Sequence, residues 1–181
     1  NLVLVARGEV DLKIAATELR AKTDVLTVAM DVADTKACID LMAKAEAEFG
    51  RIDVLINNAG MHARGNVETK TPTDIAAMVD VNLRSPLVLS SAVIPYLRKV
   101  GGGAIVNVGS LAGRAPLQGA STYCATKAGL RAFTYALADE IQDSGIKIGV
   151  VSPGPIDTGF IMDEIDLVED IVFSQPMSTA Q

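Results

Sequence analysis

The stretch AIVNVGSLAGRAPLQGASTYCATKAG, residues 104–129, places an apolar run directly before a helix-forming run. The run AIVNV at 104–108 is typical of a buried strand, and a helix is expected from Ser121 onward. Two side chains of that helix, Tyr123 and Lys127, are four residues apart. At a rise of about 1.5 Å per residue they lie on one face, roughly 6 Å apart along the axis.

A phenol and an ammonium on one helix face form an acid–base pair. A free tyrosine has a pKa of about 10, and an adjacent Lys⁺ favours the phenolate and lowers that pKa. Ser110 follows the apolar run, where its hydroxyl would hold a carbonyl or alcohol oxygen. Together the three residues predict proton transfer at a substrate oxygen. Taken alone, the pair also fits a half-buried Tyr123 beside a solvated Lys127.

Outward from this stretch, short apolar runs alternate with longer amphipathic ones, the pattern of a parallel sheet with helices on both faces. The clearest helix follows Asp34 as its N-cap and ends at Gly50. Its apolar stripe is Cys38, Leu41, Met42, Ala45 and Phe49. The expected strands are residues 2–6, 25–30, 54–57, 104–108 and 147–151. We therefore expect one α/β domain.

The composition of the chain argues against several classes of function. The 181 residues carry a net charge of −6 with a pI near 4.8, which argues against nucleic acid or anionic membranes as partners. No apolar stretch approaches the 18 residues of a membrane span. Cys38 and Cys124 have neither metal-ligand spacing nor a disulfide framework, so we expect no metal site and a cytoplasmic location.

Three further segments occur in order around the first: LINNAG at 55–60, Asn82 within DVNLRSP, and SPGPIDTGF at 152–160. With these motifs the chain resembles the short-chain dehydrogenase/reductase family, in its common single-domain branch. The resemblance covers essentially all of residues 1–181. It implies a three-layer, doubly wound Rossmann-type sheet and an oxidoreductase that uses a nicotinamide cofactor.

The resemblance also implies the catalytic roles. Ser110 orients the substrate oxygen, Tyr123 is the general acid/base, and Lys127 holds the nicotinamide ribose and lowers the pKa of Tyr123. Asn82 completes the group, because in the family its carbonyl binds a water that links Lys127 to solvent.

The residues around Asn82 predict an irregularity in the helical backbone. A helical pattern runs from about Thr73 to Leu97, and the carbonyl of Asn82 would accept from the N–H of residue 86. Pro86 has no N–H and crowds that carbonyl, so the helix is expected to bend there. The alternative is a helix that ends near Arg84 and restarts.

The tip of the first expected strand bears on cofactor choice. Arg7 stands there with no carboxylate at the end of the strand, and Glu9 more naturally begins the next helix. A guanidinium suits the 2′-phosphate of NADP, whereas a carboxylate suits the ribose hydroxyls of NAD. We therefore expect NADP(H) rather than NAD(H). The alternative for Arg7 is a solvated loop charge.

Further cofactor contacts follow from the resemblance. The pair Asp31 and Val32 brackets the adenine, and Tyr123 and Lys127 reach the ribose. The remaining residues line the end of the fourth family strand and cover the nicotinamide: Asn58, Ala59, Gly60, Pro153, Gly154, Ile156 and Thr158. His62, just after the NNAG turn, is expected to be an exposed loop imidazole, with a substrate contact as the alternative.

The family pattern also predicts missing ends. Residues 2–6 correspond to the family's second strand, so the first strand, Gly-rich turn and first helix are expected to precede this chain. A last helix and strand are expected to follow it. Without the first strand the order 3-2-1-4-5-6 has a hole, and residues 2–6 and 25–30 are not expected to pair with 54–57. Such a fragment is not expected to fold alone.

The sequence thus predicts an NADP(H)-dependent reductase or dehydrogenase acting on a carbonyl/alcohol pair, with a ketone, an aldehyde or a 3-oxoacyl thioester as substrate. A non-catalytic NADP-binding sensor or scaffold and an epimerase or dehydratase of nucleotide sugars are the alternatives. Small residues on the helix that carries Tyr123 predict a homodimer or homotetramer, since family members pair this helix across a two-fold axis. They are Ala125, Ala128, Gly129, Ala132 and Ala136.

Overall fold

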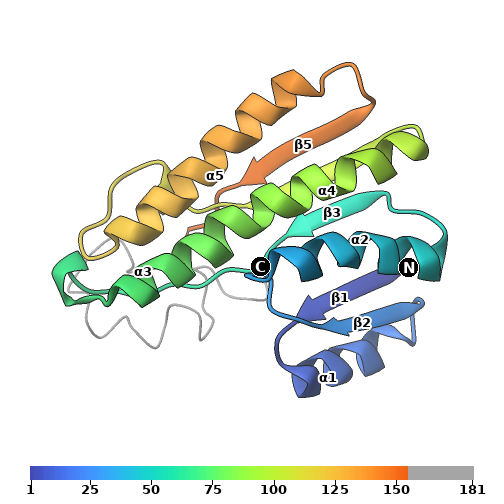
Figure 1. The fold of residues 1–181 in the computed structure, drawn as a ribbon, viewed down its shortest axis with the longest axis horizontal. Helices are drawn as coiled ribbons and strands as arrows, with labels where there is room; N and C mark the ends of the chain where they lie inside the picture. The colour runs from blue at the N-terminus through green and yellow to red at the C-terminus, as the bar shows by residue number, and fades with distance from the viewer. Residues whose placement is uncertain (155–181) are drawn as a thin grey trace.

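The fold was analysed in a computed structural model, which describes residues 1–154. Five parallel strands alternate with helices, as the apolar runs predict (Figure 1). The strands are β1 (Leu2–Ala6), β2 (Val25–Ala29), β3 (Val54–Asn57), β4 (Gly103–Val108) and β5 (Ile146–Val151). The helices are α1 (Glu9–Leu19), α2 (Thr35–Phe49), α3 (Pro72–Val79), α4 (Ser85–Lys99) and α5 (Ser121–Glu140), with short turns η1 (Val67–Thr69), η2 (Asp80–Arg84) and η3 (Leu111–Gly113).

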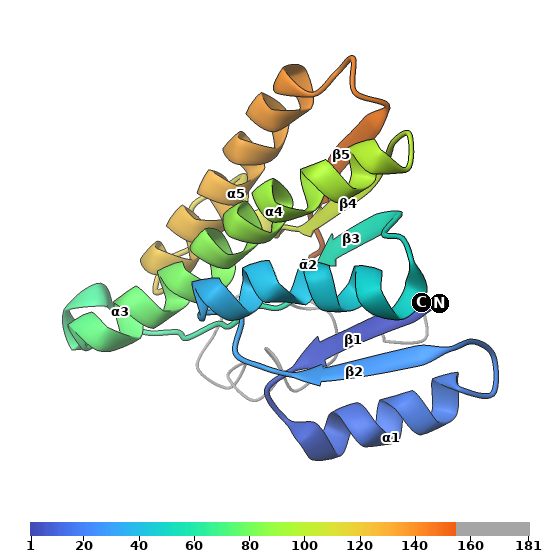
Figure 2. The ribbon, with the colours of Figure 1, turned by 45° about the vertical axis from the view of Figure 1, so that its right-hand side comes forward.

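The strands form two separate parallel sheets. One has the order β1-β2, with Leu2 opposite Val25, and the other has the order β3-β4-β5, with Val54 opposite Ala104. Figure 2 shows β1 and β3 running side by side in the same direction, yet no ladder joins them within residues 1–154. Each sheet therefore presents one unpaired strand edge to the other, at the position where the sequence led us to expect a hole.

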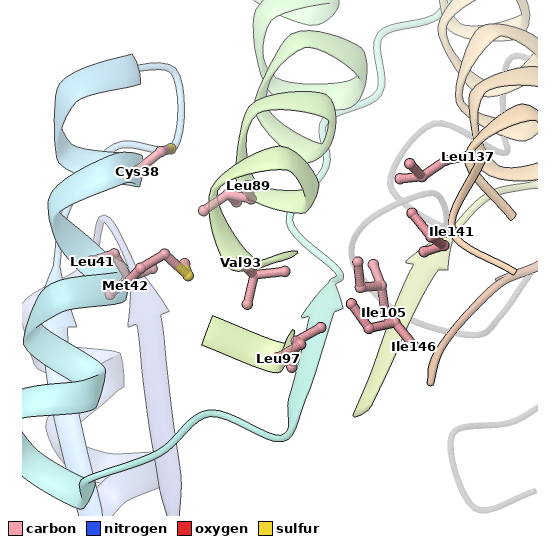
Figure 3. Close-up of a cluster of buried hydrophobic side chains, with 10 residues drawn as sticks. All are labelled: Cys38, Leu41, Met42, Leu89, Val93, Leu97, Ile105, Leu137, Ile141 and Ile146. Atoms are coloured by element: carbon pink, nitrogen blue, oxygen red, sulfur yellow. The ribbon is translucent and has the colours of Figure 1, made fainter. Parts of the chain in front are cut away.

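The core lies under three helices that pack side by side, α2, α4 and α5. Helix α2 begins as predicted, because the Asp34 side chain accepts a hydrogen bond from the backbone N–H of Ala37 (3.0 Å), and Gly50 ends it at a φ of 76°. Figure 3 shows its buried side chains Cys38, Leu41 and Met42 facing α4, with Ile105, Leu137 and Ile141 on the other side of α4. The cluster comprises Cys38, Leu41, Met42, Leu89, Val93, Leu97, Ile105, Leu137, Ile141 and Ile146.

Elements α3, η2 and α4 form one continuous helix, Pro72–Lys99, of 28 residues. By length and composition alone this helix qualifies as a membrane span, with a mean hydropathy of 1.3 in its most apolar window, although 39% of that window is buried. Leu89, Val93 and Leu97 place its apolar face in the core cluster. Packing within the protein therefore accounts for its composition.

Candidate active site

Three of the predicted catalytic side chains meet where β4 ends and α5 begins. Ser110 follows β4 and caps η3, its hydroxyl accepting from the backbone N–H of Ala112 (3.1 Å). Tyr123 and Lys127 lie one turn apart on the buried face of α5, and only 8% and 4% of their surfaces are exposed. The alternative of a solvated lysine beside a half-buried tyrosine does not describe this pair.

Close packing holds Lys127 in place. Its Nζ donates a hydrogen bond to the carbonyl oxygen of Val108 at the end of β4 (2.8 Å). A Cβ on Gly113 would lie 2.7 Å from the carbonyl carbon of Lys127, so only glycine lets η3 approach α5 this closely. Burial lowers the pKa of Lys127 to about 8, since a desolvated ammonium gives up its proton more readily.

The pKa of Tyr123 changes in the direction opposite to the one that the sequence predicts. We expected Lys127 to lower it, but burial of the phenol raises the pKa of Tyr123 above its ordinary value, and a hydrogen bond with Ser110 opposes that change. The lysine Nζ lies 5.8 Å from the centroid of the phenol ring. Removing water from a phenolate outweighs the stabilisation it receives here, so the phenol keeps its proton at neutral pH.

Asn82 lies in a π-helical turn, η2, that interrupts the long helix. The N–H of Ser85 donates to the carbonyl of Asp80 five residues back, and Pro86 offers no N–H to Asn82. The helix neither ends near Arg84 nor restarts, so the disturbance predicted from Pro86 takes the form of a change in register.

The side chain of Asn82 has contacts that the sequence did not predict. Its Oδ1 accepts from the N–H of Met61 (2.8 Å), and its Nδ2 donates to the carbonyl of Met61 (2.8 Å) and to Oγ1 of Thr126 (3.3 Å). Asn82 is 1% exposed. The side chain of Asn82 therefore links the loop after β3 to helix α5, which carries Tyr123 and Lys127.

A second buried polar network supports the sheet beneath the site. The Nδ2 of Asn57 donates to Oδ1 of Asn107 (2.8 Å) and to Oγ of Ser90 (3.2 Å), and the Nδ2 of Asn107 donates to Oγ1 of Thr134 (2.8 Å). These contacts join β3, β4, α4 and α5. Sequence reasoning missed Asn107, although an amide in the middle of an apolar strand is a detectable signal.

The predicted cofactor residues surround one large cleft. Its volume of about 1590 Å³ includes the gap between the facing edges of β1 and β3, which Leu41, Met42, Leu89 and Val93 also line. From there it extends to Tyr123 and Lys127. Every predicted cofactor residue within residues 1–154 lines it: Arg7, Asp31, Val32, Asn58, Ala59, Gly60, Tyr123, Lys127, Pro153 and Gly154. Ile156 and Thr158 lie outside the described residues.

Three of these predicted cofactor residues have a defined local environment. Arg7 is exposed at the tip of β1. Asp31 closes a turn by accepting from the N–H of Ala33 (2.8 Å). A Cβ on Gly60 would lie 3.4 Å from Oδ1 of Asn82 and 3.7 Å from Nζ of Lys127, which are ordinary van der Waals distances. Arg7 and Lys127 line the same cleft.

His62 differs from expectation. It is half-buried rather than an exposed loop imidazole, and it lines the cleft. Its ring packs edge-to-face on Tyr123, with the centroids 4.4 Å apart and an interplanar angle of 77°.

Comparison with known proteins decides the family. Residues 1–166 match the sequence profile described as short chain dehydrogenase. The chain belongs to the short-chain dehydrogenase family. The matched range contains Ser110, Tyr123 and Lys127, and it includes all of β1 to β5.

Two relatives and one solved structure illustrate the similarity. The NADP-dependent 3-hydroxy acid dehydrogenase of Schizosaccharomyces pombe is 38% identical over 163 residues, 88% of this chain and 63% of that protein. The acetoacetyl-CoA reductase of Shinella zoogloeoides is 35% identical over 147 residues, 81% of this chain and 61% of that protein. A metagenomic short-chain oxidoreductase solved in complex with NADP superposes with a TM-score of 0.79 at 32% identity, covering 84% of this chain and 70% of the other.

This short-chain dehydrogenase chain spans less than two thirds of the length of the two relatives. The similarity shows the Rossmann-type fold of the family, and the activity is a matter of proposal. The cofactor, the substrate and the role of each side chain are matters of proposal.

Proposed function

We propose that this protein is an NADP(H)-dependent oxidoreductase that interconverts a carbonyl and an alcohol, with Tyr123 as the general acid/base. The observation that carries the proposal is the buried group of Tyr123, Ser110 and Lys127 opening on a cleft that reaches Arg7. A bound nicotinamide would supply the hydride, and the protein would supply the proton and the positioning.

The protonated phenol of Tyr123 is the form that reduction of a carbonyl requires. Burial raises the pKa of the phenol, so at neutral pH it carries the proton that a developing alkoxide needs. Ser110, hydrogen-bonded to Tyr123, is placed to hold the substrate oxygen beside that proton. Lys127 puts a cation within 6 Å of the phenol ring, which stabilises the phenolate left after transfer.

Arg7 supports the choice of NADP(H). It lines the cleft at the tip of β1, and a guanidinium binds a phosphate through two parallel hydrogen bonds. One relative is named as NADP-dependent, and one similar structure was solved with NADP. Asp31 and Val32 would flank the adenine, while Asn58, Ala59, Gly60, Pro153 and Gly154 would line the path of the dinucleotide.

For the substrate we propose a ketone, an aldehyde or a 3-oxoacyl thioester. The names of two relatives include a 3-hydroxy acid and acetoacetyl-CoA, both of which belong to this carbonyl/alcohol chemistry. Leu111, Ala112, Pro116 and Leu117 line the cleft near Tyr123, which suits an apolar portion of the substrate.

We also propose a cytoplasmic homodimer or homotetramer. Ala125, Ala128 and Ala132 lie exposed on α5, where small side chains permit close approach of a second subunit. Light scattering at micromolar concentration tests the assembly, and a monomer contradicts it.

The decisive experiment for the function is oxidation of NADPH against a panel of ketones, aldehydes and 3-oxoacyl thioesters. Turnover of at least one carbonyl class, with NADPH preferred over NADH, is the expected result. Tight NADPH binding without turnover of any class would instead identify a sensor or scaffold.

A further inference from the structure

We propose that His62 is a positioning residue for Tyr123, holding the phenol ring in the orientation that proton transfer requires. The inference rests on the proposed function, and it concerns a residue outside the motifs that identify the family. The edge-to-face contact at 4.4 Å and 77° is the geometry that aromatic pairs prefer.

The backbone on either side of this contact is fixed. Met61 precedes His62, and its N–H and C=O both bond to the Asn82 side chain. Asn82 in turn bonds to Thr126 on α5, and Oγ1 of Thr126 donates to the carbonyl of Tyr123 (2.8 Å). This chain of hydrogen bonds links the backbone next to His62 to the backbone of Tyr123, which limits how far the two backbones can separate.

The contact also covers part of the phenol. Tyr123 belongs to a small apolar cluster with Met78 and Ala120, against which Met61 and Leu117 pack. His62 lies at the border between this cluster and the cleft. Groups on the other sides of the phenol are Ser110, which hydrogen-bonds it, and Lys127, whose Nζ lies 5.8 Å from the ring centroid. The imidazole thus limits both the rotation of the ring and the access of water to it.

The kinetics of two variants distinguish the packing of a flat ring at position 62 from the acid–base chemistry of an imidazole. His62→Ala removes the contact, and we expect kcat to fall about tenfold with KM for the substrate nearly unchanged, because a misplaced proton donor slows the chemical step. His62→Phe keeps a flat ring of similar size, and we expect it to restore most of kcat. Equal kcat in wild type and His62→Ala overturns the proposal, as does a His62→Phe variant as slow as His62→Ala.

A spectroscopic measurement keeps the proposal testable independently of turnover. With ¹³C-labelled tyrosine, the chain's three tyrosines give resolvable signals, and Tyr123→Phe assigns the one of interest. In His62→Ala we expect the ring-current shift of Tyr123 to disappear and its pKa to move down toward 10, because water reaches the phenolate. His62→Phe should retain both. Unchanged shift and pKa in His62→Ala would show that the imidazole does not hold the ring.

Different variants test the proposed function and the role of His62. If Tyr123→Phe keeps its activity, the proposed function is wrong whatever His62 does. If Tyr123→Phe is inactive and His62→Ala matches wild type in kcat, shift and pKa, only the role of His62 is wrong.

Discussion

The half of the molecule that carries Tyr123 and the half that carries Arg7 are built differently. Around Tyr123, the sheet β3-β4-β5 packs under α4 and α5, and Asn82, Asn107 and Lys127 are buried with their polar atoms bonded. Around Arg7, the sheet has two strands, β1 and β2, and α1 leaves Val10 71% exposed.

This contrast indicates which half of the molecule would position the proton-transfer group and which half would bind the cofactor. The proton-transfer group is held by its own packing, so its geometry exists before a ligand arrives. Arg7 and Asp31 are exposed side chains at strand ends, where a ligand can reach them without any change in the packing. Substitutions in the first half should therefore change kcat or stability, and substitutions in the second half should change cofactor affinity.

The largest effect is expected from Lys127→Met, which keeps most of the length of the side chain and removes its charge. We expect kcat to fall at least about a hundredfold, since acid–base assistance typically contributes 10²–10⁴-fold. Lys44→Met, on the exposed face of α2, is the matched control and should leave kcat unchanged. Comparable rates in the two variants would remove Lys127 from the mechanism.

The next effect is on stability as a function of pH. Lys127 has a pKa of about 8 in the folded protein, below the ordinary 10.5 that the unfolded chain adopts. Between these values only the unfolded state holds the proton, so the free energy of unfolding should rise with pH from about 8 to 10.5. Relative to Lys127→Met, we expect wild type to gain up to about 3 kcal/mol in urea denaturation across this range. A constant difference contradicts the burial argument.

A smaller loss of stability is expected from Asn107→Ala. The change removes one of the hydrogen-bond partners of Asn57 Nδ2 and of Thr134 Oγ1 in a buried site, which costs about 1–3 kcal/mol. Asn66→Ala, at an exposed loop position, serves as the control. Urea denaturation that gives equal midpoints for the two variants would show that the network does not stabilise the catalytic half.

The smallest effect is expected from Arg7→Ala in the other half. Loss of a charge-assisted bond should weaken NADPH binding about tenfold or more while leaving NADH binding nearly unchanged. Isothermal titration with both cofactors measures this, with Arg20→Ala at the end of α1 as the control. Equal losses for NADPH and NADH would refute the contact between Arg7 and the 2′-phosphate.

Much of the fold could be predicted from the sequence. Apolar runs located all five strands within one or two residues, and Asp34 and Gly50 located both ends of α2. These features depend on local periodicity and capping, which a sequence displays directly. The spacing of Tyr123 and Lys127 likewise predicted a shared helix face.

The remaining features depend on contacts between segments far apart in the chain. The direction of the pKa change at Tyr123 was wrong because spacing along a helix carries no measure of burial. Segments far apart in the chain meet at two places, the hydrogen bonds between Asn82 and Met61 and the ring contact between His62 and Tyr123. No local pattern around His62 distinguishes a packed imidazole from a solvated one.

Tyr123→Phe is the sharpest test of the proposed general acid/base, because it removes one hydroxyl beside Lys127 and leaves the residues around Arg7 intact. We expect kcat to fall by at least about a hundredfold while the Kd for NADPH changes little, since only the transferable proton is lost. Retention of more than about a tenth of the wild-type kcat, measured by NADPH oxidation with the best carbonyl substrate, would contradict it.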